Sequence, residues 1–243
     1  MSLENVQVDT ASPRDKDGFM RGVKDCVPTL LGYLSIGLAA GVVQKTAGLS
    51  IAEIALMSLI LYAGSAQFIA AGMIAASSSP TAIIITILFV NLRHLLLSAA
   101  LSPYFRHLSP LRNILVGSLL TDETFGVAIN QTAKKNQINE SWMHGLNITA
   151  YLNWFFANIA GALLAQWISD PEKFGLEFAL PAMFIGILVL SILGRNKIKT
   201  DIAVAIIAVV IAVGCSFVMS SSMGIIVATI MASTIGMVVE KWK

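Results

Sequence analysis

The chain has 243 residues, of which 56% are hydrophobic and only 12% are charged. Ordinary soluble domains carry about twice that charged fraction, so this composition, with a mean hydropathy of +0.77, excludes a water-soluble globular protein. The net charge of +2 gives no indication of a nucleic-acid partner, because membrane topology explains the basic residues better. The sequence predicts an integral protein of the lipid bilayer.

The N-terminal residues 1–25 are polar and charged, and they lack the apolar core and small-residue cleavage site of a signal peptide. We therefore predict a cytosolic tail over 1–25 and one transmembrane helical domain over 26–243. Cys26 and Cys215 are far apart and have no histidine nearby, so the sequence indicates neither a disulfide nor a metal site.

Long continuous apolar runs predict an all-α, polytopic fold with about seven or eight hydrophobic segments. A bilayer-spanning helix needs about 20 apolar residues, whereas barrel strands would alternate in segments of about ten. The apolar segments lie at about 27–47, 52–77, 81–103, 114–131, 142–168, 177–194, 201–219 and 223–239.

The basic residues of the connections suggest two topologies. Eight full crossings with both termini in the cytosol place most lysines and arginines inside but leave Arg106 and Arg112 outside. If the second and fourth segments are instead broken or re-entrant, those two arginines also become cytosolic. The runs AGSAQ (63–67) and LTDET (120–124) are typical of broken helices. The loop charges leave both topologies open.

The second segment contains a candidate substrate-binding run at Gly64, Ser65 and Gln67. Small residues let a membrane helix unwind so that its backbone amides point at an anionic ligand, and Gln67 adds a side-chain amide. Close helix packing is the alternative explanation for the small residues, although it does not explain Gln67.

The third segment carries Asn91, Arg93 and His94 where a membrane helix is otherwise apolar. An arginine near the helix centre costs about 2.5–3.5 kcal/mol on insertion scales, so Arg93 should face a partner or a water-filled cavity. We predict that the three side chains line a substrate-binding cavity. In the alternative, Arg93 extends to the membrane interface and His94 bonds a neighbouring helix.

The fourth segment carries Asp122 and Glu123, the only acidic pair within an apolar stretch. Acids in such a position can take up and release a proton during transport, so we predict a proton-coupling role. Alternatively, the pair caps a helix N-terminus on a short cytosolic loop.

Sequence motifs for catalysis are missing: the chain has no P-loop, nucleophile elbow, HExxH run or metal-spaced Cys/His cluster. We therefore expect no enzyme, no cofactor and no metal. A channel for an ion or small solute, or a membrane sensor or structural subunit, remains as an alternative to a transporter.

The motifs AGSAQF (63–68), NLRH (91–94) and TDE (121–123), preceded by spaced glycines after Pro28, together resemble the AzlC family. These are large subunits of bacterial branched-chain amino acid exporters, and the resemblance covers about residues 18–190. It implies export of leucine, isoleucine and valine, with methionine as a further candidate, across the inner membrane together with a small AzlD-type subunit. A homo-oligomer is the alternative assembly. Because no nucleotide-binding motif is present, we expect a secondary, proton-coupled mechanism.

Overall fold

The computed structural model describes residues 16–132, 137–168, 198–219 and 221–241, with single residues between 173 and 192. These residues form helices and no strand, which confirms the all-α prediction. They separate into two compact units, 1–183 and 184–243, and each is described by itself. The prediction of one domain over 26–243 and a tail over 1–25 stays untested, although the first helix already begins at Lys16.

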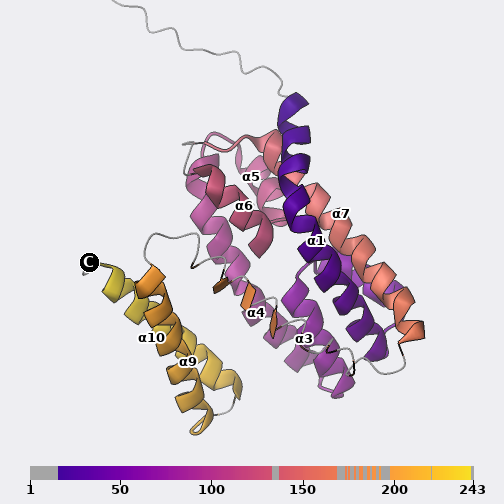
Figure 1. The fold of residues 1–243 in the computed structure, drawn as a ribbon, viewed down its shortest axis with the longest axis vertical. Coiled ribbons are helices and arrows are strands. Elements are labelled where there is room, and N and C mark those ends of the chain that lie inside the picture. The colour runs from indigo at the N-terminus through magenta and orange to yellow at the C-terminus, as the bar shows by residue number, and fades with distance from the viewer. Residues whose placement is uncertain are drawn as a thin grey trace, which may run out of the picture. The chain divides into compact units, whose positions relative to one another are not determined.

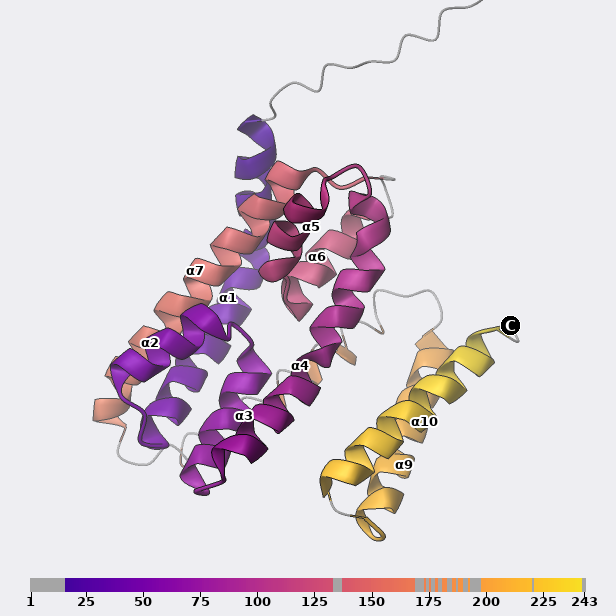
Figure 2. The ribbon, with the colours of Figure 1, turned by 180° about the vertical axis from the view of Figure 1, so that it is seen from behind.

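Unit 1 contains the helices that form the candidate site, and Figures 1 and 2 show them from opposite sides. Their bounds are α1 Lys16–Thr46, α2 Ile51–Ile60, α3 Gly64–Ala75, α4 Pro80–Leu101, η1 Ser102–Phe105, α5 Pro110–Ser118, α6 Asp122–Thr132, α7 Glu140–Leu164 and η2 Ala165–Trp167.

Unit 2 contains α9, Ile198–Ser216, and α10, Ser221–Lys241, which pack side by side (Figure 1). Within the described residues four helices are long and apolar enough to cross a membrane, at Gly18–Thr46, Pro80–Phe105, Glu140–Trp167 and Ile198–Ser216. This is fewer than the predicted seven or eight segments, because two segments are broken into short helices and α10 contributes only the shorter apolar stretch Ile230–Val239. The predicted segment at 177–194 lies largely outside the described residues.

The scaffold of unit 1 is a parallel pair of helices, α1 and α7. Their backbones touch at four glycines, where an added Cβ would overlap a carbonyl oxygen of the facing helix. Small residues allow this close approach in membrane helices, where packing rather than water exclusion drives association. The four glycines and the facing carbonyls are Gly22 with Trp142, Gly145 with Phe19, Gly41 with Asn158 and Gly161 with Leu38.

The second apolar segment forms a re-entrant hairpin of two short helices, α2 and α3. The start of α2 packs beside the end of α7, where Leu49 and Ile54 cluster with Ala162. The chain breaks at 61–63, near the middle of α7, and α3 then returns toward the end it came from. Gln67 of α3 accordingly reaches back to Ser58 of α2, over a Nε2 to Oγ distance of 3.1 Å.

The fourth apolar segment forms a second hairpin, α5 and α6, which enters from the opposite end of unit 1. At the start of α5, Arg112 lies 3.6 Å from Glu140 at the start of α7. The break at 119–121 reaches the middle of α1, where Thr121 contacts Tyr33. The prediction of broken or re-entrant segments is therefore confirmed, and the two tips meet at mid-depth (Figure 2).

Helix α4 runs between the two hairpins, in the direction opposite to α1 and α7 (Figure 1). Ser79 caps its N-terminus by accepting a hydrogen bond from the Ala82 amide, and Pro80 occupies the first position, where no amide partner is needed. Its outer face exposes large apolar side chains suited to lipid contact: Ile84, Ile85, Leu88, Phe89, Leu92, Leu95 and Leu96.

We predict that Gly41→Ala destabilises unit 1 by about 1–3 kcal/mol, because the new methyl group meets the Asn158 carbonyl and neither backbone can yield cheaply. The melting temperature of the detergent-solubilised protein measures the effect. Gly32→Ala is the matched control in the same helix, since nothing lies within 4 Å of its added Cβ. Equal melting temperatures for the two variants would contradict the backbone contact.

Candidate functional site

A small polar cavity lies where the two hairpin tips meet α1, α4 and α7. Its free space is about that of a single water molecule, which is less than an amino acid needs. A larger molecule can enter only if a hairpin or a side chain moves. The cavity is lined by Tyr33, Tyr62, Ala63, Gly64, Arg93, His94, Thr121, Asp122, Glu123 and Trp154.

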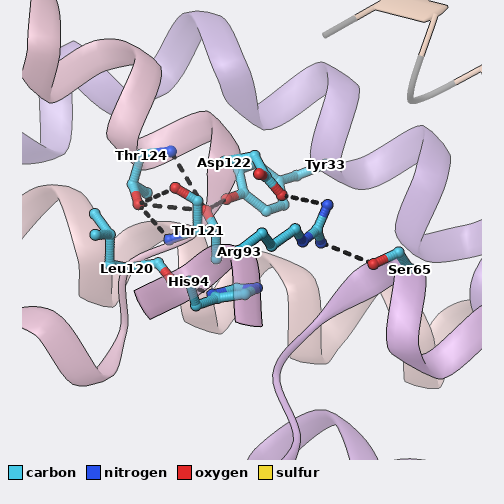
Figure 3. Close-up of polar contacts among 8 residues, drawn as sticks. All are labelled: Tyr33, Ser65, Arg93, His94, Leu120, Thr121, Asp122 and Thr124. Atoms are coloured by element: carbon cyan, nitrogen blue, oxygen red, sulfur yellow. Dashed lines mark hydrogen bonds and ion pairs between the residues drawn. The ribbon is translucent and has the colours of Figure 1, made fainter. Parts of the chain in front are cut away.

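Arg93 joins both hairpins through its guanidinium group (Figure 3). Its Nη1 lies 2.9 Å from Oδ2 of Asp122 at the start of α6. Its Nη2 donates to Oγ of Ser65 at the start of α3, over 2.8 Å. With the Arg93 and Asp122 side chains only 22% and 16% exposed, the pair is shielded from solvent, and the charge of Arg93 is met by protein groups.

His94 lies beside Arg93, and its Nδ1 is 3.0 Å from the carbonyl oxygen of Leu120 (Figure 3). A carbonyl only accepts, so Nδ1 carries the proton in the neutral ring and Nε2 is left as an acceptor. Nε2 is buried and has no hydrogen-bond partner among the described residues. The cavity therefore has a hydrogen-bond acceptor without a partner in its lining, at Nε2 of His94.

The N-terminus of α6 is closed by threonine side chains (Figure 3). Oγ1 of Thr121 accepts from the Thr124 amide over 3.3 Å, and Oγ1 of Thr124 accepts from the Thr121 amide over 2.9 Å. The Tyr33 hydroxyl also contacts Oγ1 of Thr121. Two of the amides at this tip are thus already satisfied.

The N-terminus of α3 differs, because its N-cap residue Ala63 offers no side-chain hydrogen bond. Gly64 follows it and lines the cavity. An added Cβ at Gly64 would lie 3.0 Å from Cη2 of Trp154, so the indole lies directly against the backbone there. The start of α3 therefore lies at the cavity without a side-chain cap, which makes this helix end suited to an anion.

Gln67 takes part in a buried amide network below the cavity. Its Oε1 accepts from Nε1 of Trp154 over 2.7 Å, and its Nε2 contacts Oε1 of Gln44 at 3.4 Å. Gln44 donates in turn to Oδ1 of Asn158 over 2.8 Å. All three amide side chains are fully buried, so the network ties α3 to α1 and α7.

Five of the eight predicted site residues line the cavity: Gly64, Arg93, His94, Asp122 and Glu123. Ser65 reaches it through its bond to Arg93. Gln67 and Asn91 are not among the lining residues, and their roles in substrate binding stay predictions. The sequence reasoning missed Tyr33, Tyr62, Thr121 and Trp154. Thr121 adjoins the predicted acids, whereas the tyrosines and Trp154 resembled ordinary packing residues.

An open, mostly apolar groove adjoins the cavity along the second half of α4 and α5. It is much larger than the cavity, and Leu120, whose carbonyl bonds His94, belongs to its lining. The other lining residues are Leu95, Ser98, Ala99, Leu101, Ser102, Phe105, Asn113, Ile114, Val116, Gly117 and Met143. A charged cavity thus lies next to an apolar surface.

This fold and site define a helical membrane protein with a polar cavity enclosed between two re-entrant hairpins. The sequence model of the family described as AzlC protein matches residues 28–168, more than half of the chain, and the chain therefore belongs to the AzlC family. The resemblance drawn from the motifs is confirmed.

Relatives from several bacteria support this assignment. The chain is 32% identical to the inner membrane protein YgaZ of Escherichia coli, over 71% of this chain and 73% of that protein. An uncharacterized membrane protein of Helicobacter pylori is 29% identical, over 81% of this chain and 86% of that protein. The branched-chain amino acid transport protein AzlC of Bacillus subtilis is 24% identical, over 82% and 79%. No solved structure matches the chain.

Proposed function

We propose that this chain carries out secondary export of branched-chain amino acids across the bacterial cytoplasmic membrane. The substrates are leucine, isoleucine and valine, with methionine as a further candidate. The observation that carries the proposal is the enclosed cavity in which Arg93 and Asp122 lie 2.9 Å apart between two half-helix ends. An amino acid zwitterion needs partners of both signs of charge, which this ion pair supplies once the two groups separate, and transporters bind substrates at broken helices.

The apolar groove beside the cavity supports an amino acid with an aliphatic side chain. The head of leucine needs ionic partners, while its side chain gains free energy on leaving water for apolar surface. Cavity and groove meet at His94 and Leu120, so one substrate molecule contacts both when the site opens. The Bacillus subtilis relative, named as a branched-chain amino acid transport protein, supports this substrate class.

Export against a gradient needs a driving ion, and Asp122 and Glu123 are the acids at the cavity. In the proposed mechanism one of them takes up a proton from outside and releases it to the cytosol as the hairpins alternate. Asp122 is held by Arg93, and Glu123 lies beside it on the same helix turn, so substrate and proton share one site. This sharing couples the two movements.

For the orientation, we propose that both termini and the α5–α6 hairpin ends face the cytosol. Arg112 lies at the same end of unit 1 as the start of α7, and Asp25 of α1 accepts from Nε1 of Trp142 there. The re-entrant hairpins thus bring Arg106 and Arg112 to the N-terminal side, as the excess of cytosolic basic residues favours.

Labelling of single cysteines tests this orientation in a variant that lacks Cys26 and Cys215. Ser79 and Ser109 are both exposed but lie at opposite ends of α4 and its following loop. A membrane-impermeant maleimide added to whole cells should label Ser79→Cys, and should label Ser109→Cys only after the membrane is opened. The reverse pattern would show that the termini face outward.

We propose a small AzlD-type membrane subunit as the partner, with a homo-oligomer as the competing assembly. The central experiment measures leucine accumulation in cells fed a leucine-containing dipeptide, with the chain alone, with the chain and its partner, and with neither. Lower leucine accumulation only when the chain and its small subunit are both present supports a two-subunit exporter. Efflux that does not saturate with leucine would indicate a channel, and equal accumulation in all three would indicate a sensor or structural subunit.

In the same assay, Arg93→Lys should reach the membrane but lower export about tenfold or more, because each lost charge-assisted hydrogen bond is worth about 1.5–3 kcal/mol. A lysine ammonium cannot span Ser65 and Asp122 with the planar fork of a guanidinium. Membrane level, measured by immunoblotting, is the control for insertion. Normal export by Arg93→Ala would show that Arg93 takes no part in substrate binding.

The acids are tested in vesicles that carry a pH gradient. Asp122→Asn and Glu123→Gln remove charge with little change of shape, so the coupling acid should lose gradient-driven leucine export while leucine exchange across the membrane continues. Export at the parental rate by both variants would place the proton path elsewhere. It would also reduce the pair to acids that stabilise the α6 N-terminus.

A further inference from the structure

Tyr62 lies at the tip of the α2–α3 hairpin, in the break between Ile60 and Gly64, and lines the cavity. Only 7% of this residue is exposed. Its hydroxyl makes no hydrogen bond of ordinary geometry with the described residues, although the Tyr33 hydroxyl lies close by. A buried hydroxyl left in this way costs stability, which a purely structural role does not explain.

The backbone of Tyr62 is also strained, since its φ of 39° lies in the left-handed region that bulky residues avoid. The ring is held by an edge contact with Tyr151, at a centroid distance of 4.7 Å. The surrounding helices therefore fix the ring at the cavity in spite of the strain. Strain of this kind at a ligand site persists where it places a group for binding.

We propose that the Tyr62 hydroxyl, the uncapped N-terminus of α3 at Gly64 and the Arg93 guanidinium form the subsite for the substrate's carboxylate. The proposal rests on the proposed function and adds Tyr62 as a substrate-binding residue. The hydroxyl and the α3 amides are hydrogen-bond donors, and Arg93 supplies the positive charge.

Asp122 indicates how a carboxylate fits this subsite, because its own carboxylate already lies 2.9 Å from Nη1 of Arg93. The free space accepts about a water molecule, so an incoming carboxylate must take the place of Asp122 on Arg93. The displaced Asp122, with Glu123 and the bare Nε2 of His94, then faces the substrate's ammonium group. The lining of one cavity thus offers hydrogen-bond partners for both ends of the zwitterion.

Binding of radiolabelled leucine to the full chain, solubilised with its co-expressed small subunit, tests the subsite, with leucinamide as the competitor that lacks a carboxylate. Parental protein should bind leucine at least about tenfold more tightly than leucinamide, because one charge-assisted donor alone supplies that factor. Tyr62→Phe should raise the dissociation constant for leucine about tenfold and leave that for leucinamide within about twofold.

Tyr151→Phe is the matched control, since it removes a neighbouring hydroxyl that bonds the Leu59 carbonyl outside the cavity. It should leave both dissociation constants unchanged. Tyr62→Phe should keep or raise the melting temperature, because it deletes a buried hydroxyl that makes no hydrogen bond of ordinary geometry and retains the ring. Lower affinity with undiminished stability separates a ligand group from a structural one.

Unchanged leucine affinity in folded Tyr62→Phe protein would overturn the proposal. Failure of this variant to fold would also overturn it, because it would show that the hydroxyl has a structural role. Equal affinity of the parent for leucine and leucinamide, or no binding of either, would also overturn it. Parental protein that binds leucine through Tyr62 but exports none would keep the subsite and remove the proposed export function.

Discussion

The three-way contact of Arg93 with Asp122 and Ser65 is the interaction on which the rest of the arrangement depends. Each hairpin breaks its helix at mid-depth, where unsatisfied backbone groups and a charge are costly. One guanidinium meets the starts of both returning helices, so a single side chain holds two tips that enter from opposite ends. Removing Arg93 would leave the shielded Asp122 carboxylate without this counter-charge, and breaking a fully buried ion pair in this way costs about 3–5 kcal/mol.

The contacts around Arg93 divide unit 1 into a tightly packed part and a more loosely packed part. Backbone contact at four glycines and the amide network through Gln44, Gln67 and Asn158 bind α1, α3 and α7 closely together. Helix α4 buries only Leu101, near its C-terminal end, and meets the hairpin tips through the polar side chains of Arg93 and His94. The α5–α6 hairpin packs into the same apolar core as α1 and α7 through Val116, Leu120 and Ala128, so the polar contacts of α4 are the ones that can change with least loss of core packing.

Composition and motif spacing predicted the all-α membrane fold, the broken segments and five of the cavity residues. Arg93 and the acids were predictable because a charge in an apolar stretch must have a partner. Gln67 is a polar residue in a similar apolar stretch, yet its partners are the buried side chains of Gln44, Ser58 and Trp154. Tyr62 was not predictable, because its significance lies in a backbone angle and an unpaired hydroxyl that only the fold defines.

The order of the contacting residues along the chain has a consequence for biosynthesis. Arg93 leaves the ribosome before Asp122, and α1 leaves it long before α7, since chains are made from the N-terminus. Of its partners Ser65 and Asp122, the Arg93 guanidinium has only Ser65 until translation reaches α6. During that time α4 is more stable close to the translocon or the aqueous interface, where the charge is solvated. The hairpin tips close only when later segments arrive, and the assembly of this half of the protein is therefore post-insertional.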